Sequence, residues 1–441
     1  MPTDLNRLFR ACDPAGTLRL DTEEGKKYYI DFSSTRGGEA VKKLANRILR
    51  LHPEQTCQLF TGHIGCGKST ELLRLKKHLE QQDFLVVYFD SSDELNMKDV
   101  EVSDILLAIA RQTSAVLEAA SVPASSRYLS NLLKETADFL QTPVELGVEA
   151  ELSLGIAKVT AKTKDSREAR SRLRQYLEPR TDNLIQAINE DLLKPARKQL
   201  AAMGKTGLVA IVDSLEKLDN RRINNSDKTL PEYLFGTRGR ELSNLDCHVI
   251  YTIPFVLMFS NAREAVENDM AGGRRTEILP MVPVRFPDGS DCSEGLELLQ
   301  QMVLARAFPN LSPQERLDSL LEIFDREESL IRLCKASGGH VRKLLSFLFS
   351  CLEEQEELPI TRDTLEVVLR QERQRLARAI DSEEWQLLRK VRETKEVIAE
   401  REYETLLRSL FVFGYNHKKF GEWFDVNPIL LECKELSSEP G

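Results

Sequence analysis

A glycine-rich turn between an apolar run and a leucine-spaced segment constrains the fold of this chain more than any other feature. From Cys57 to Glu80 the sequence reads CQLFTGHIGCGKSTELLRLKKHLE, and the leucines after the turn recur at the spacing of an amphipathic helix. Residues 62–69 fit the pattern G-x-x-x-x-G-K-[ST], which needs a strand before it and a helix after it. The segment therefore predicts the first strand, loop and helix of an α/β fold.

Residues 62–69, here called the phosphate loop, have the chemistry of a phosphate cradle. The glycines let successive backbone N–H groups point at a β-phosphate, Lys68 reaches the β- and γ-phosphates, and Ser69 offers its hydroxyl to Mg²⁺. The following helix places its positive N-terminal end under the anion. The pattern tolerates almost any residue at His63 and Cys66, so neither is given a catalytic role. We expect a nucleotide to be bound by Gly62, His63, Ile64, Gly65, Cys66, Gly67, Lys68, Ser69 and Thr70.

A second apolar run supplies the carboxylate that such a loop needs for its metal ion. Residues 207–212 are apolar and rich in β-branched side chains, as in a strand buried on both faces of a parallel sheet. Asp213 ends this run and is the expected partner of Mg²⁺, which we expect it to hold through water. Glu216 follows three residues later, where a carboxylate orients the attacking water in phosphoryl transfer. The alternative for Glu216 is a solvated acid at the start of a helix.

Charge and composition exclude several classes of protein. The 441 residues contain 61 Lys and Arg against 70 Asp and Glu, so a net charge of −9 gives no global field for a nucleic-acid backbone. No run approaches the roughly 18 apolar residues of a membrane helix, and no apolar signal segment follows the N-terminus. The eight cysteines show no zinc-binding spacing. We predict a cytoplasmic protein with reduced thiols and no membrane partner.

Together these motifs resemble the AAA+ and STAND group of P-loop ATPases, which includes origin-recognition ATPases and NACHT-type switches. Residues 34–44 (STRGGEAVKKL) are similar to the segment that these proteins place before the first strand, and Arg36 is its marked residue beside the adenine. Residues 247–253 (CHVIYTI) resemble the next strand, with Thr252 at the place of a polar γ-phosphate sensor; the alternative is a plain strand residue. The resemblance implies ATP and Mg²⁺ as cofactors.

Two arginine segments extend the resemblance. Residues 272–284 (GGRRTEILPMVPV) place Arg274 and Arg275 where AAA+ proteins carry an arginine that reaches a neighbouring subunit's nucleotide; a solvated loop is the alternative. Residues 337–345 (SGGHVRKLL) look like the second sensor of a helical lid, with Arg342 on the γ-phosphate. Most AAA+ proteins place the catalytic Glu directly after the metal-binding Asp, whereas here that residue is Ser214. Glu216 is closer to the STAND arrangement, which implies ATP binding with slow hydrolysis to ADP and phosphate.

The predicted fold is a three-layer α/β P-loop NTPase core with a parallel sheet, followed by a helical lid and a C-terminal winged-helix-like domain. The boundaries are an N-terminal segment over residues 1–30, a core over 31–289 with an insertion at about 121–205, a lid over 290–357, a winged-helix-like domain over 358–436 and a tail over 437–441.

The insertion contains two unusual stretches. Residues 144–164 alternate apolar and polar side chains with period two, which predicts a strand or hairpin with one wet face. Its edge is either a pairing surface for a partner or second subunit, or a hairpin packed on the core. Residues 166–200 predict a charged helix. We interpret its arginines as a solvated face rather than a nucleic-acid site: Arg167, Arg170, Arg172 and Arg174.

Near the C-terminus, residues 411–415 and 422–426 predict two short strands around a turn at 417–419, after helices near Trp385 and Tyr403. Residues 382–433 carry eight Lys and Arg against ten Asp and Glu, which is not the basic footprint of a DNA reader. We therefore expect a protein-contact or autoinhibitory module, with DNA as the alternative partner.

The sequence thus predicts an ATP-dependent switch or assembly ATPase that acts through a protein partner or self-association, by way of the insertion and the C-terminal domain. Resemblance suggests a place in bacterial stress or phage defence. The alternatives are a DNA-binding loader that uses the winged helix and a nucleotide-stabilised scaffold that does not hydrolyse ATP.

Overall fold

The computed structural model describes residues 4–16, 18, 20, 22–122, 127–139, 156–157, 166–223, 226–355, 357–398 and 401–437. The strand or hairpin expected over residues 144–164 lies outside them, apart from 156–157. The chain forms two compact units, described one at a time. The loop unit comprises Met1–Ala40, Gly62–Glu71 and Leu279–Gly441, and the sheet unit comprises Val41–Thr61 and Leu72–Ile278.

A parallel sheet of five strands, in the order β2-β3-β4-β1-β5, organises the sheet unit. Its strands are β1 (Cys57–Thr61), β2 (Phe84–Asp90), β3 (Gly207–Asp213), β4 (His248–Thr252) and β5 (Glu277–Ile278). Of these, β1, β3 and β4 confirm the strands expected near residues 57, 207 and 247.

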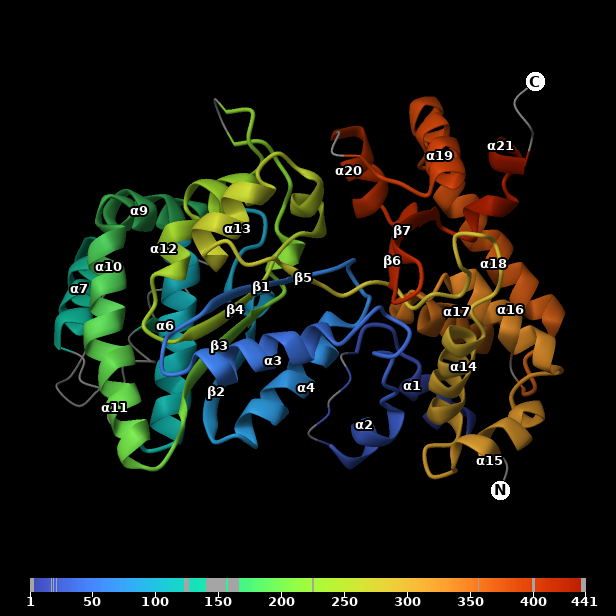
Figure 1. Cartoon of the computed structure of the whole chain (residues 1–441), viewed down its shortest axis with the longest axis horizontal. Coiled ribbons are helices and arrows are strands. Elements are labelled where there is room, and N and C mark those ends of the chain that lie inside the picture. The colour runs from blue at the N-terminus through green and yellow to red at the C-terminus, as the bar shows by residue number, and fades with distance from the viewer. Residues whose placement is uncertain are drawn as a thin grey trace. The chain divides into compact units, whose positions relative to one another are not determined.

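Helices cover both faces of this sheet, as strands without a wet face require. Every residue of β3 is buried. The crossover from β1 to β2 runs through α4 (Lys68–Glu80), and the return connections from β2 to β5 run in the opposite direction. Because parallel crossovers are right-handed, the two directions place their helices on opposite faces. Figure 1 shows α3 and α4 on one side of the sheet and α6, α10 and α11 on the other. The three-layer P-loop core is therefore confirmed.

The sheet unit holds these further helices: α3 (Ala40–Leu51), α5 (Ser91–Glu94), α6 (Val102–Ala119), α7 (Arg127–Phe139), α9 (Arg167–Leu177), α10 (Thr181–Ala187), α11 (Lys194–Ala202), α12 (Gly239–Ser243) and α13 (Arg263–Ala271). The single helix expected over residues 166–200 is wrong in detail. A 3₁₀ turn at Glu178–Arg180 and a π turn at Ile188–Leu193 separate α9, α10 and α11. Pro179 and Pro195 lie in or just after these turns and cannot donate a helical hydrogen bond.

The loop unit is mostly helical. Its helices are α1 (Leu5–Ala11), α2 (Glu23–Tyr28), α14 (Ser293–Ala307), α15 (Pro313–Asp318), α16 (Glu327–Ser337), α17 (Val341–Glu354), α18 (Arg362–Ala377), α19 (Ser382–Thr394), α20 (Arg401–Arg408) and α21 (Lys434–Ser437). Helices α14, α16, α17 and α18 pack in sequence, and α1 and α2 pack on α14. In the described part of the chain no helix is both long and apolar enough to cross a bilayer.

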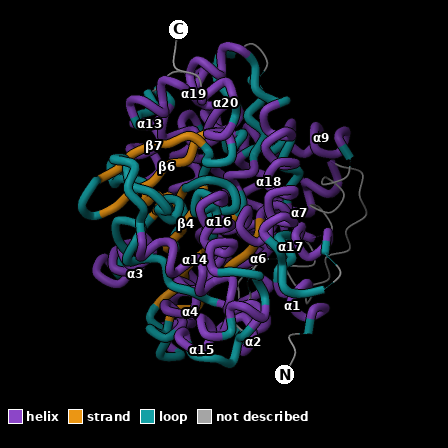
Figure 2. Tube along the Cα trace, turned by 90° about the vertical axis from the view of Figure 1, so that its right-hand side faces the viewer, coloured by secondary structure: helices purple, strands orange, loops and turns teal. Residues whose placement is uncertain are grey.

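An antiparallel hairpin of β6 (Val412–His417) and β7 (Gly421–Val426) follows α19 and α20 and packs against them, which confirms the two strands expected there. Figure 2 shows this hairpin in orange, among the helices of the unit. Trp385 and Trp423 are buried core residues of this unit.

Candidate functional site

The phosphate loop owes its shape to glycines with positive φ. Gly62, Gly65 and Gly67 have φ of 153°, 84° and 104°, which L side chains rarely adopt. A Cβ at Gly62 would lie 2.4 Å from the Leu279 oxygen, so a side chain is also excluded for lack of space. The loop then passes directly into α4. The motif therefore folds locally as the sequence predicts.

Lys68 is held against the backbone of its own loop. Only 3% of the residue is exposed, and its Nζ donates to the carbonyl oxygens of Gly62 and His63, each at 3.0 Å. Ser69 and Thr70 follow in the first turn of α4 and are half-buried. The arrangement places a positive charge and two hydroxyl-bearing residues at the positively polarised end of a helix.

Arg36, which the family resemblance places near the nucleotide, contacts the phosphate loop. Its Nη2 donates to the Cys66 oxygen at 2.9 Å, and its guanidinium lies 5.2 Å from the centre of the Phe32 ring. The residue is 5% exposed, and burial lowers the pKa of Arg36. Within the described residues its buried Nε has no hydrogen-bond partner. A buried cation with an unused donor next to the loop suits an anionic ligand.

His63 joins the phosphate loop to the C-terminal hairpin. The Gly414 N–H donates to His63 Nε2 at 2.9 Å, and the Gly414 oxygen accepts from the Met281 N–H at 3.0 Å. Nε2 must therefore be unprotonated. Burial, with a contribution from His340 and Lys68, lowers the pKa of His63 to about 3. The hairpin thus donates a hydrogen bond to a neutral histidine of the phosphate loop.

The lid contacts the next two loop residues. His340 bonds to the Ile64 oxygen through Nε2 at 3.0 Å, while its Nδ1 accepts from the Lys343 N–H and caps α17. Burial, with Lys343 next, lowers the pKa of His340 to about 3. The Arg342 N–H donates to the Gly65 oxygen at 3.2 Å, and its side chain is exposed. The structure thus brings the expected lid segment to the phosphate loop.

In the sheet unit, Asp213 ends β3 inside a set of hydrogen bonds. Its Oδ1 accepts from the Ser214 N–H and its Oδ2 from the Tyr88 hydroxyl, both at 2.7 Å. The Ser91 hydroxyl donates to the Asp213 carbonyl oxygen at 2.6 Å. Ser214 has the left-handed conformation, with φ of 69°, which is uncommon for a residue other than glycine. This turn directs the Ser214 N–H at the preceding carboxylate.

Thr252 fixes the start of the turn that carries Glu216. Its hydroxyl accepts from the Leu215 N–H at 3.0 Å and is 3.4 Å from the Val212 oxygen. Glu216 follows in a short 3₁₀ turn, Leu215–Lys217, and is buried. Thr252 therefore joins β4 to the segment after Asp213.

Arg274 and Arg275 lie in the loop between α13 and β5, and both are exposed. Arg274 Nη1 donates to the Ala271 oxygen at 3.0 Å, and the Arg275 oxygen accepts from Arg47. Their exposure suits either a solvated loop or a contact with a second subunit.

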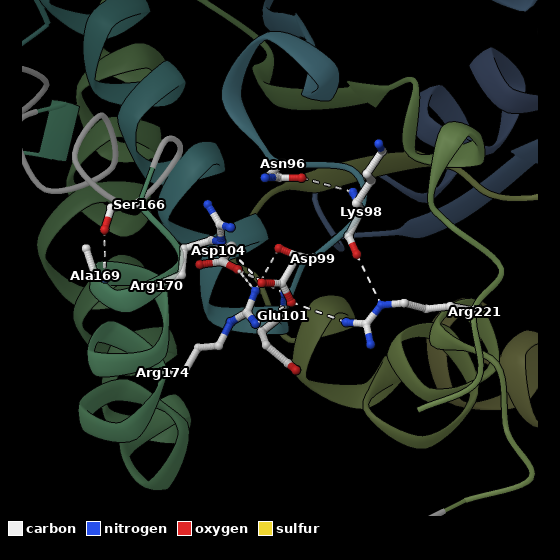
Figure 3. Close-up of polar contacts among 10 residues, drawn as sticks. All are labelled: Asn96, Lys98, Asp99, Glu101, Asp104, Ser166, Ala169, Arg170, Arg174 and Arg221. Atoms are coloured by element: carbon white, nitrogen blue, oxygen red, sulfur yellow. Dashed lines mark hydrogen bonds and ion pairs between the residues drawn. The ribbon is translucent and has the colours of Figure 1, made fainter. Parts of the chain in front are cut away.

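Two of the four arginines of α9 correct the expected solvated face, whereas Arg167 is exposed and Arg172 pairs with Glu168 at the surface. Arg170 and Arg174 bind Asp99 at 3.2 and 2.7 Å, and Arg174 also binds Asp104 at 3.1 Å (Figure 3). Arg221, which follows β3, reaches the same Asp99 at 3.2 Å. Because these guanidinium groups converge on carboxylates, Arg170 and Arg174 form salt bridges within the sheet unit and do not form a solvated face. Burial raises the pKa of Asp99, but its bonds to the arginines outweigh this and leave it lowered.

The donor groups fit the predicted nucleotide and metal ion. The Ser69 hydroxyl and the Asp213 carboxylate are hard oxygen donors of the kind that Mg²⁺ prefers. Lys68 and Arg36 are buried cations at the phosphate loop. A Cβ at Gly67 would meet nothing within 4 Å, so the space in front of this glycine is open. The buried Nε of Arg36 is an orphaned donor among the described residues. Within the loop unit, Lys68, Arg36 and Ser69 fit the phosphates of a nucleotide, and within the sheet unit Asp213 has the chemistry of a Mg²⁺ ligand.

Sequence reasoning missed the supports of the site. Tyr88 belongs to an otherwise apolar strand. Its hydroxyl is the one local sign that a polar group packs against this strand before Asp90. His63 occupies a variable motif position, and its partner Gly414 lies 351 residues further along the chain. Neither contact has a local signal in the sequence.

No protein-family model matches the chain, and a search of curated proteins finds no match. Among solved structures, the Walker-type ATPase of Pyrococcus abyssi is 11% identical, with 92% of this chain and 98% of that chain covered and a TM-score of 0.38. The ORC2 protein of Aeropyrum pernix, in ADPNP-ADP complexes, is 14% identical, with 90% of each chain covered and a TM-score of 0.37. Cdc6p from Pyrobaculum aerophilum is 11% identical, with 92% and 94% covered and a TM-score of 0.38. The fold assignment rests on the strand order and phosphate loop of this chain itself.

Proposed function

We propose that this protein binds Mg²⁺-ATP and acts as a nucleotide-dependent switch or assembly ATPase of the AAA+ or STAND type. One observation carries the proposal. Three consecutive residues of the phosphate loop, His63, Ile64 and Gly65, are hydrogen-bonded to the lid and the C-terminal hairpin within one compact unit. A ligand that reshapes the loop therefore acts on both elements.

The proposed roles follow the chemistry of each group. Lys68 binds the β- and γ-phosphates, Arg36 supports the loop, Ser69 and Asp213 hold Mg²⁺, Thr252 senses the γ-phosphate, Glu216 orients water and Arg342 closes the lid. When bound, Mg²⁺-ATP supplies the phosphoryl group and neutralises the charge that develops on it. Because Ser214 replaces the acid expected after Asp213, we propose slow turnover.

The switch follows from the bonds that Lys68 makes. Its ammonium donates to two carbonyls of the loop, and a phosphate competes for the same three protons. The His63 carbonyl that loses this bond belongs to the residue that accepts from Gly414. Nucleotide binding then shifts the population of hairpin arrangements by its differential affinity for them.

Partner contacts are proposed through the insertion and the C-terminal domain, for which the helices α19 and α20 with the β6–β7 hairpin support a winged-helix-like description. Arg274 and Arg275 are exposed, as a residue that reaches a second subunit's nucleotide must be.

Calorimetric titration with ATP tests the core of the proposal. Wild type should bind and Lys68→Ala should not. Lys76→Ala should bind like wild type, because Lys76 lies on the same helix and its ammonium pairs with Glu80. Equal binding by Lys68→Ala and wild type would refute it.

Light scattering with and without Mg²⁺-ATP, with released phosphate assayed in the same samples, tests assembly and turnover. ATP-dependent assembly that is lost in Arg274→Ala/Arg275→Ala supports a shared site, whereas a monomer that holds ATP supports a switch awaiting a partner. Unchanged turnover in Glu216→Gln would favour the scaffold alternative.

Salt-dependent DNA binding whose slope falls on neutralising Lys418 and Lys419 would favour the loader alternative. A role in bacterial stress or phage defence is tested by plating phage on bacteria that express wild type or Lys68→Ala.

A further inference from the structure

We propose that Tyr88 is a positioning residue for the Asp213 carboxylate and thereby sets the affinity of the nucleotide site for Mg²⁺. This inference rests on the proposed function, because the ion concerned is the Mg²⁺ bound with ATP. Tyr88 does not contact the ion in this scheme; it acts through Asp213.

The register of the sheet directs Tyr88 at Asp213. In the parallel pairing of β2 and β3, Tyr88 is opposite Ile211, and Asp90 is opposite Asp213. Paired residues project to the same face, and so do residues two apart on one strand. Tyr88, Ile211 and Asp213 therefore share a face, and the length of the tyrosine ring carries its hydroxyl to Asp213 Oδ2 at 2.7 Å.

A donor on each oxygen holds the plane of this carboxylate. The Ser214 N–H donates to Oδ1 and the Tyr88 hydroxyl donates to Oδ2. The terminal torsion of an aspartate is broad, so a donor on one oxygen alone defines its plane less well than a donor on each. Asp213 is thus oriented before a metal-bound water reaches it.

A purely structural role for the tyrosine predicts a different result. In that case the lost hydroxyl lowers stability and leaves metal affinity alone. Tyr251 on β4 is a matched control, because its buried hydroxyl donates to the Leu242 carbonyl at 2.8 Å and not to Asp213. Both tyrosines belong to the same sheet.

The experiment measures ATP binding to the full chain by calorimetry, in EDTA and across a Mg²⁺ series, for wild type, Tyr88→Phe and Tyr251→Phe. Loss of a bond that orients a metal ligand costs 10–100-fold in metal affinity when the ligand is direct. For Tyr88→Phe we expect the half-saturating Mg²⁺ concentration to rise about tenfold, at the lower end of that range because Asp213 acts through water. ATP affinity in EDTA should stay within about twofold of wild type. Tyr251→Phe should leave both quantities unchanged.

A folded Tyr88→Phe protein with a wild-type Mg²⁺ midpoint overturns this inference alone, and so does an equal rise in both tyrosine variants. A wild type that binds no ATP overturns the proposed function as well. Thermal unfolding followed by circular dichroism verifies that each variant is folded, and Tyr88→Leu repeats the test should the phenylalanine variant be unstable.

Discussion

Lowering the pH from 7 to 5 should destabilise the loop unit through two buried histidines. His63 accepts a hydrogen bond from Gly414, and His340 accepts one from the Lys343 N–H while it binds the Ile64 oxygen. Burial keeps both rings neutral in the folded protein. Protonation would turn the acceptor nitrogen of each ring into a donor that faces another N–H.

The size of the effect follows from the pKa values. Burial, before any other cause, lowers the pKa of His63 and of His340 from 6.5 to about 3. Because the folded-state pKa lies below the unfolded value, the stability is present above pH 6.5 and is lost as the pH falls toward 3. At about 1.4 kcal/mol per pH unit, each histidine costs about 2 kcal/mol at pH 5. The two together cost about 4 kcal/mol.

Tryptophan fluorescence reports on this unit selectively. The chain has two tryptophans, Trp385 and Trp423, and both lie buried in the loop unit. Urea unfolding at pH 7 and pH 5 therefore gives the free energy of unfolding of that unit at each pH. His63→Gln and His340→Gln should each remove about half of the pH-dependent loss, whereas His417→Gln, at the hairpin turn, should keep it.

Two results would refute this reasoning. One is a wild type whose unfolding free energy falls by less than about 1 kcal/mol between pH 7 and pH 5, against the 4 expected from linkage. The other is a His63→Gln/His340→Gln double variant that loses as much stability as wild type, because the titrating groups would then lie elsewhere.

Three further predictions concern other positions. Gly339→Ala places a Cβ 1.7 Å from the Val282 oxygen at φ of 72°, so tryptophan-monitored unfolding should show a loss of more than about 3 kcal/mol. Asp99→Asn leaves clustered arginines without their shared carboxylate and should cost the sheet unit about 3 kcal/mol by circular dichroism, whereas Glu168→Gln, at an exposed helix pair, should cost less than about 0.5. Burial, then the neighbouring Glu178, raises the pKa of Glu101 to about 7, so its contribution to stability is lost as the pH rises through 7. Glu101→Gln should therefore flatten the fall in sheet-unit stability between pH 5 and pH 7, followed by circular dichroism.

The core of the fold could be predicted because its determinants are local. The glycines and Lys68 define the phosphate loop within eight residues, and the apolar run before Asp213 has the composition of a strand buried on both faces. Arg36 could be placed beside the loop only through the family resemblance. The domain boundaries, and the roles of Glu216, Arg274 and Arg275, stay predictions.

The supports of the site could not be predicted because they depend on pairings between distant segments. Tyr88 meets Asp213 only once β2 and β3 are in register, and no periodicity in either strand specifies that register. Arg170 and Arg174 looked solvated because the pattern of one helix does not show that Asp99, about 70 residues earlier, packs against it. In both cases a charged or polar group was recognised, and its partner was not.

The bonds between the phosphate loop and the rest of its unit set how strongly a nucleotide can act on the lid and the C-terminal hairpin together. Three hydrogen bonds connect the loop to these elements, at His63, Ile64 and Gly65. Each contributes about 0.5–1.5 kcal/mol net. If binding exchanges all three, the coupling free energy is at least about 1.5 and at most about 4.5 kcal/mol, or roughly 10- to 2,000-fold in affinity. About 2.6 kcal/mol is enough to move a joint equilibrium of lid and hairpin from 1:9 to 9:1. Because coupling is reciprocal, a partner whose binding breaks Gly414's bond with His63 changes nucleotide affinity by the same factor by which the nucleotide changes that partner's affinity.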